Sequence, residues 1–207
     1  MPRSLWKRIK ADIAAQTEAI AMGDVTDLDN FMGAVIDATA FGVHRGAIER
    51  ARATAGISIV AGGRCDDSVG YFVRPTILEV DDPSDEAMTT EYFGPILSVH
   101  VYADRAYEAM LTQMESAAAY ALTGSIIAGD RAAIAAATEK LRFAAGNFYI
   151  NDKPTGAVVG QQPFGGGRAS GTNDKAGSAQ NLLRWTSVRS IKETFVPPTD
   201  YRYPHMG

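Results

Sequence analysis

A short aromatic and β-branched run, Asn147 to Ile150, opens into a long loop rich in Gly, Thr and Gln that extends to Gly171. The run predicts a buried strand, and single glycines in such a loop typically serve tight turns or close approaches of backbone. A loop of this length inside a compact domain is usually functional. Because ligands of open α/β sheets bind beyond strand ends, we expect a strand that opens into a ligand-binding loop.

Two further pairs of residues have types and spacings that suit ligand binding. Gly156 and Ala157 are consecutive small residues whose amides could hold an anion in a backbone nest, although such a pair is more often a plain turn. Glu91 and Phe93 share a face if the chain is extended. A carboxylate accepts strong hydrogen bonds, for example from ribose hydroxyls; the alternative for a single glutamate is a solvated loop position.

Two features that suggest chemistry have simpler explanations. Cys65 is the single cysteine, and a nucleophile needs a stabilised thiolate; Asp66 and Asp67 follow it and favour the thiol, so we expect an ordinary loop cysteine. The run from Gly165 to Gly167 lacks the Lys-Ser/Thr ending and strand–helix context of a phosphate loop. We assign it to turn geometry.

Four segments together resemble one family. They are GGRCDDSVGYFVRPTI (62–77), EYFGP (91–95), NDKPTGAVVGQQPFGG (151–166) and RWTSVRSIKE (184–193). They are similar to the C-terminal part of the Δ1-pyrroline-5-carboxylate dehydrogenase family within the aldehyde dehydrogenase superfamily, and the resemblance runs from about Leu5 to His205. Its enzymes oxidise L-glutamate γ-semialdehyde to L-glutamate with NAD in proline catabolism.

The resemblance implies a role for each candidate residue. Glu91 and Phe93 would contact the nicotinamide ribose of NAD. Backbone amides of Gly156 and Ala157 would hold the substrate's α-carboxylate, and Phe164 would pack on its aliphatic chain. The family's catalytic cysteine, its oxyanion-stabilising Asn and its Rossmann domain belong to segments upstream of these residues. The resemblance therefore implies a C-terminal portion of the enzyme that is inactive alone and needs the missing N-terminal portion.

Bulk composition limits the possible partners. The 207 residues are 46% apolar and 21% charged with a net charge of −4, which is ordinary for a soluble protein and argues against nucleic acid. No apolar run reaches the roughly 20 residues of a membrane span, and no signal-peptide segment is present. A single cysteine suits a reducing compartment, the cytoplasm or, in a eukaryote, the mitochondrial matrix. The three histidines show no metal-ligand spacing.

Helical and strand periodicities alternate along the chain. Helices are predicted from Ser4, which can cap the first one, to about Met22, and after the capping residues Asp104 and Asp130. Another helix is predicted from Asp37 or Ala38 to Ala55, and the residues on its one apolar face are Phe41, His44, Ile48 and Ala51. Strands are predicted at 57–60, 71–80, 95–102 and 124–128. The pattern predicts an α/β fold, a mostly parallel sheet flanked by helices. We expect residues 1–184 to be part of a catalytic domain.

The segment from Trp185 to Phe195 alternates apolar and polar residues and predicts a late strand. By the resemblance, residues 185–207 form an oligomerisation strand and tail that add to a partner's sheet in a homo-oligomer. Two alternatives remain open at this point. The chain could be a non-catalytic oligomerisation or scaffold module, or part of another semialdehyde dehydrogenase.

Overall fold

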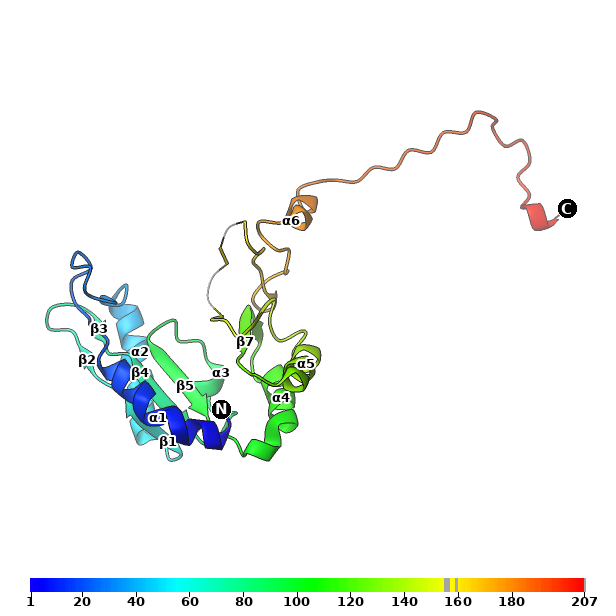
Figure 1. Cartoon of the computed structure of the whole chain (residues 1–207). Coiled ribbons are helices and arrows are strands. Elements are labelled where there is room, and N and C mark those ends of the chain that lie inside the picture. Colours follow the sequence, from blue (N-terminus) through cyan, green and yellow to red (C-terminus); the bar gives the residue numbers. More distant parts are fainter. Residues whose placement is uncertain (155–156, 159, 207) are drawn as a thin grey trace.

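The computed structural model describes residues 1–154, 157–158 and 160–206. Its elements gather in two halves, joined by the segment after β5, and a mostly extended tail runs away from both (Figure 1). The first half contains α1 (Arg3–Glu18), α2 (Ala38–Ala53), β1 (Ile57–Ala61), β2 (Cys65–Asp66), β3 (Phe72–Val73), β4 (Thr76–Val80), α3 (Glu86–Thr89) and β5 (Ile96–His100). The second half and the tail contain the 3-10 helix η1 (Asp104–Ala106), α4 (Tyr107–Ser116), β6 (Tyr120–Ala121), β7 (Thr123–Ile126), α5 (Arg131–Lys140), β8 (Asn147–Ile150), β9 (Gly167–Arg168), α6 (Ala179–Leu183) and the 3-10 helix η2 (Pro204–Met206).

Strand β4 is the centre of the first half. It pairs antiparallel with β1 and parallel with β5. Its side chains alternate between the two faces of the sheet: Ile77 packs with Trp6 of α1, whereas Leu78 and Val80 pack with Ala51 of α2. The first half is therefore a three-layer arrangement in which a helix covers each face of the sheet.

Helix α2 follows its predicted pattern closely. It begins after Asp37, whose carboxylate accepts a hydrogen bond from the Ala40 amide at 2.8 Å. Such a cap satisfies one of the donors that the first helical turn leaves unpaired. Gly56 follows the helix with a φ of 85°, a conformation that glycine adopts without strain. The predicted buried stripe is confirmed: Phe41, His44, Ile48 and Ala51.

The caps predicted for Ser4 and Asp104 are wrong. Helix α1 begins at Arg3, and neither η1 nor α4 has a side-chain cap. Instead, the amide and hydroxyl of Ser4 both donate to Oδ1 of Asp104, at 3.0 and 3.1 Å. Asp104 thus satisfies the first turn of a helix 100 residues earlier in the chain and is not available for its own.

The second half is built on shorter pairings. Strands β7 and β8 are parallel, and β6 pairs antiparallel with β9. Helix α5 is capped as predicted, because Asp130 accepts from the Ala132 amide at 2.8 Å. Its inner face joins α4 in a cluster of Leu111, Ala137 and Leu141. This small cluster supports β8, from which the predicted ligand-binding loop emerges.

The α/β class is confirmed, but the pairing is mixed rather than mostly parallel. The link between β1 and β4 contains only the β2–β3 pair, and a link without a crossover helix gives antiparallel strands. The link from β4 to β5 includes α3, and these strands are parallel. The predicted strand 71–80 is two strands, divided at Pro75, which has no amide to donate.

The strand predicted from Trp185 to Phe195 is not formed in the single chain. Within the described range, these residues pair with no other strand, and their large apolar side chains are exposed. An alternating pattern becomes a strand only when a neighbouring edge supplies backbone partners. No such edge lies beside the tail in Figure 1.

Candidate functional site

The predicted cofactor residues lie on a turn between α3 and β5. Glu91 is exposed, and the Phe93 ring is 87% exposed. Phe93 has a φ of 56°, a left-handed conformation that a bulky residue adopts only when its surroundings impose it. Both side chains are therefore accessible to a ligand on a turn whose shape is fixed from beneath.

His44 supports this turn. Its side chain is fully buried on α2, and its Nε2 donates to the Tyr92 carbonyl oxygen at 2.8 Å. A carbonyl can only accept, so the proton is on Nε2, and the buried Nδ1 meets no partner among the described residues. A Cβ at Gly94 would overlap the imidazole ring. Glycine is thus required at position 94 by close packing against His44.

Helix α3 is tied to α2 by one arginine. The Arg50 guanidinium contacts Asp85 at 2.8 Å and Glu86 at 3.0 Å. The hydrogen bond from Arg50 holds the pKa of Asp85 below its usual range. The Tyr92 hydroxyl donates to Glu86 at 3.1 Å, and burial together with this acceptor raises the pKa of Tyr92 to about 12. These contacts fix the chain immediately before and within the turn.

The predicted substrate residues lie in the second half, beyond β8. Gly156 is outside the described residues. Ala157 is half-buried, as is Phe164, which forms an antiparallel bridge with Ala176. Among the described residues, no hydrogen bond or ion pair joins Glu91 or Phe93 to Ala157 or Phe164. Glu91 and Phe93 thus belong to the first half of the chain, and Ala157 and Phe164 to the second.

Comparison with known proteins identifies the fold. The sequence profile of the aldehyde dehydrogenase family matches residues 1–191. The chain belongs to the aldehyde dehydrogenase family. The mitochondrial delta-1-pyrroline-5-carboxylate dehydrogenase of Bos taurus is 53% identical over 206 residues, which are 99% of this chain and 37% of the bovine one. The predicted resemblance is thereby confirmed.

Solved structures agree with that assignment. The delta-pyrroline-5-carboxylate dehydrogenase of Mycobacterium tuberculosis has a TM-score of 0.85 and 58% identity, covering 100% of this chain and 38% of that one. Its crystal structure bound with NAD gives a TM-score of 0.83 at 57% identity and covers 37% of that chain. This aldehyde dehydrogenase chain thus spans a little over a third of the length of these relatives.

Cys65 and the glycine run have no catalytic surroundings in this aldehyde dehydrogenase chain. Cys65 lies in strand β2 rather than in a loop, is half-buried, and has its thiol pKa raised chiefly by burial. Gly166 is buried, and a Cβ there would lie 2.8 Å from the Ala121 carbonyl oxygen. Gly166 is therefore needed where the loop passes close to β6, in agreement with its assignment to chain geometry, whereas a Cβ at Gly167 would meet nothing within 4 Å.

The sequence did not single out three polar residues whose side chains contact the backbone next to these candidates: His44, Asn147 and Lys175. His44 was placed on the buried face of its helix, and a histidine in an apolar stripe is the signal that could have singled it out. Asn147 begins β8 and is only 9% exposed, so a polar residue opening a buried strand was a second signal. Lys175 has no comparable sequence pattern, because its partners lie ten and more residues away.

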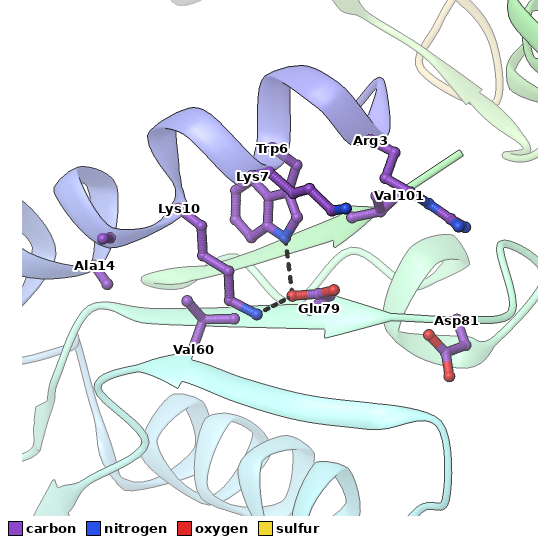
Figure 2. A pocket seen from close by; sticks show the side chains of 10 residues that line it. Arg3, Trp6, Lys7, Lys10, Ala14, Val60, Glu79, Asp81 and Val101 are labelled. Atoms are coloured by element: carbon purple, nitrogen blue, oxygen red, sulfur yellow. Dashed lines mark hydrogen bonds and ion pairs between the residues drawn. The ribbon is translucent and has the colours of Figure 1, made fainter. Parts of the chain in front are cut away.

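A sizeable cavity lies away from both groups of candidate residues. Its volume is about 710 Å³, and it lies between α1 and the sheet. In Figure 2 the Trp6 indole and the Lys10 ammonium both reach the Glu79 carboxylate. Trp6, Lys10 and Glu79 therefore bind one another at this cavity. In the described part of the chain, no cluster of His, Cys, Asp or Glu could hold a metal ion, and no helix could cross a membrane.

Proposed function

We propose that this chain carries the nicotinamide-ribose and substrate-carboxylate contacts of an NAD-dependent dehydrogenase that oxidises L-glutamate γ-semialdehyde to L-glutamate. The main support is the identity of 53% and 58% to two pyrroline-5-carboxylate dehydrogenases over almost the whole chain. NAD as the cofactor is supported by the Mycobacterium tuberculosis relative, whose structure is described as bound with NAD.

The turn before β5 suits the ribose of the cofactor. The exposed Glu91 carboxylate would accept hydrogen bonds from two ribose hydroxyls, and bonds to a charged acceptor are about twice as strong as neutral ones. The exposed Phe93 ring would pack beside the nicotinamide. When bound, NAD supplies the hydride acceptor. The role of the protein here is to hold the sugar on a turn that His44 and Arg50 have already fixed.

The loop after β8 suits an acidic five-carbon substrate. Amides of Gly156 and Ala157 would hold the α-carboxylate in a backbone nest, with Gly156 outside the described residues. Phe164 would cover the short aliphatic chain. The resembled family has serine where this chain has Ala157. Because the proposed contact is made by the backbone amide, alanine can serve there as well as serine.

The 207 residues do not supply a suitable nucleophile. Aldehyde oxidation in this family needs a cysteine thiolate to attack the carbonyl carbon and form a thiohemiacetal. Loss of the hydride to bound NAD would leave a thioester, and water would then hydrolyse that thioester. Cys65 is the single cysteine, and burial raises its pKa, which disfavours the thiolate. We therefore expect the chain alone to form no NADH from Δ1-pyrroline-5-carboxylate.

A hybrid enzyme tests this function. These residues would replace the matching segment of the bovine relative, and NADH formation from Δ1-pyrroline-5-carboxylate would be followed by absorbance. We expect turnover by the hybrid and none by the chain alone. Glu91→Ala should raise KM mainly for NAD, and Phe164→Ala mainly for the aldehyde. Turnover by the isolated chain would contradict the claim that it supplies no suitable nucleophile. A folded hybrid that assembles but shows no turnover would favour the scaffold alternative.

We also propose that the tail pairs with a second subunit. Its apolar side chains Trp185, Val188 and Ile191, which are spaced three residues apart, are 83%, 90% and 77% exposed. Such exposure is unfavourable for a segment that stays in water. A sheet edge of another copy would give the backbone partners and cover these side chains. Sedimentation of the chain with and without residues 185–207 should show loss of the oligomer on truncation, and unchanged sedimentation would exclude this role.

A further inference from the structure

Lys175 holds the loop that carries Phe164. Its ammonium donates to the carbonyl oxygen of Gly146, to that of Gly165 at 3.0 Å, and to Oδ1 of Asn147 at 3.3 Å. A lysine ammonium has three protons to donate, and these three oxygens accept all of them. One oxygen belongs to the loop and two belong to the start of β8, so Lys175 joins the loop to the sheet.

Asn147 completes this connection from the strand. Its Nδ2 donates to the Pro163 carbonyl oxygen at 2.9 Å, and its Oδ1 accepts from the Gly165 amide at 3.1 Å. These two backbone groups lie immediately before and after Phe164. Because Asn147 is only 9% exposed, water cannot readily replace its bonds. The backbone on both sides of Phe164 is therefore fixed to β8 through one amide side chain that Lys175 itself contacts.

The backbone of Phe164 itself is bonded to the segment that bears Lys175. The Phe164 amide donates to Ala176 at 3.0 Å, and the Ala176 amide donates back at 2.8 Å. Lys175, next to Ala176, has a left-handed φ of 56°, which a non-glycine residue adopts where its surroundings hold it. A Cβ at Gly146 would overlap the Gly165 carbonyl oxygen, so glycine permits this close approach.

We propose that Lys175 is a positioning residue for Phe164, which it fixes through Gly165 and Asn147. The functional consequence rests on the proposed function, in which Phe164 covers the aliphatic chain of an amino-acid semialdehyde. Lys175 has no role in the chemical step in this account. It sets the position of the ring and hence the strength with which the loop holds its ligand.

Amide hydrogen exchange of the 207-residue chain tests the positioning directly. In Lys175→Met, we expect the amides of Phe164 and Ala176 to exchange about tenfold faster, because bonds to a charged donor are lost and the loop opens locally. The Leu78 amide in β4 should be unchanged. Lys175→Arg, which keeps a charged donor, should give intermediate rates, and Lys153→Met, at an exposed lysine before the loop, should match the wild type.

The outcomes separate the possible roles of Lys175. Wild-type exchange at Phe164 and Ala176 in Lys175→Met would overturn the proposal. Equal acceleration at Leu78 would also overturn it, because Lys175 would then contribute only to global stability. Titration of the same proteins with L-glutamate, the proposed product, tests the function separately: we expect about tenfold weaker binding to Lys175→Met alone. If exchange changes as expected while the folded hybrid enzyme forms no NADH from Δ1-pyrroline-5-carboxylate, the positioning stands and the proposed function fails.

Discussion

The two halves of the molecule hold their candidate residues by different means. In the first half, β4 is buried on both faces, and three apolar clusters lie around the sheet. The turn that bears Glu91 and Phe93 contacts this core through His44. In the second half, one cluster lies between α4 and α5, and the loop bearing Phe164 depends on polar contacts from Asn147 and Lys175. The first group of residues is thus held by hydrogen bonds, ion pairs and close packing on a large apolar core, whereas polar contacts hold the second beside a smaller core.

Matched leucine truncations should show this difference most strongly. Leu78 and Leu111 are 1% and 2% exposed. We expect Leu78→Ala to lower the free energy of unfolding by about 4 kcal/mol and Leu111→Ala by about 2 kcal/mol, because the smaller cluster can relax into the cavity. Urea denaturation measures both, with exposed Leu182→Ala as the control. Equal losses of unfolding free energy would show that the two apolar cores are equivalent, and the proposed difference between the halves would then be wrong.

A methyl group added at position 94 tests how tightly the turn that bears Glu91 and Phe93 is packed. Gly94→Ala should cost about 2 kcal/mol, since its Cβ overlaps the His44 ring. In a His44→Ala background the added methyl has room, so the cost should fall below about 1 kcal/mol. Gly129→Ala, where the Cβ would meet nothing within 4 Å, is the control for urea denaturation. An unchanged cost in both backgrounds would mean that His44 does not confine the turn.

The smallest effect concerns the ion pair that fastens α1 to β4. Burial raises the pKa of Glu79, but bonds from Lys10 and Trp6 outweigh it and leave the pKa below its usual range. A lowered pKa in the folded state stabilises the protein above the unfolded pKa of about 4.3, and this stabilisation is lost as pH falls through the folded value.

Glu79→Gln should therefore lower stability by about 1 kcal/mol at pH 7 and by progressively less below about pH 4. The figure is modest because the Lys10 side chain is 43% exposed and water screens the pair. Thermal unfolding across pH measures the difference, and Glu139→Gln, in an exposed pair, is the control. A difference that persists undiminished at low pH would assign the effect to packing instead.

Local patterns predicted local structure well. The α2 stripe and the Asp130 cap depend on residues a few positions apart, so the sequence contains all the information they need. The two wrong cap predictions both involve the hydrogen bond between Ser4 and Asp104. No short stretch of sequence contains both of these residues. The same limit explains why Lys175 was missed, since its contacts exist only after β8 and the returning chain have met. The prediction of a strand in the tail was wrong for a related reason. A strand needs a neighbouring sheet edge, and the described part of the chain places none beside the tail.

The two tryptophans are intrinsic fluorescence probes of two different parts of the chain. Trp6 is 3% exposed with its indole bonded to a carboxylate, whereas Trp185 is 83% exposed on the tail. Their fluorescence should differ in wavelength and in quenching by iodide. A blue shift of the Trp185 emission would report burial of the tail. A red shift of the Trp6 emission would report unfolding of the sheet beneath α1.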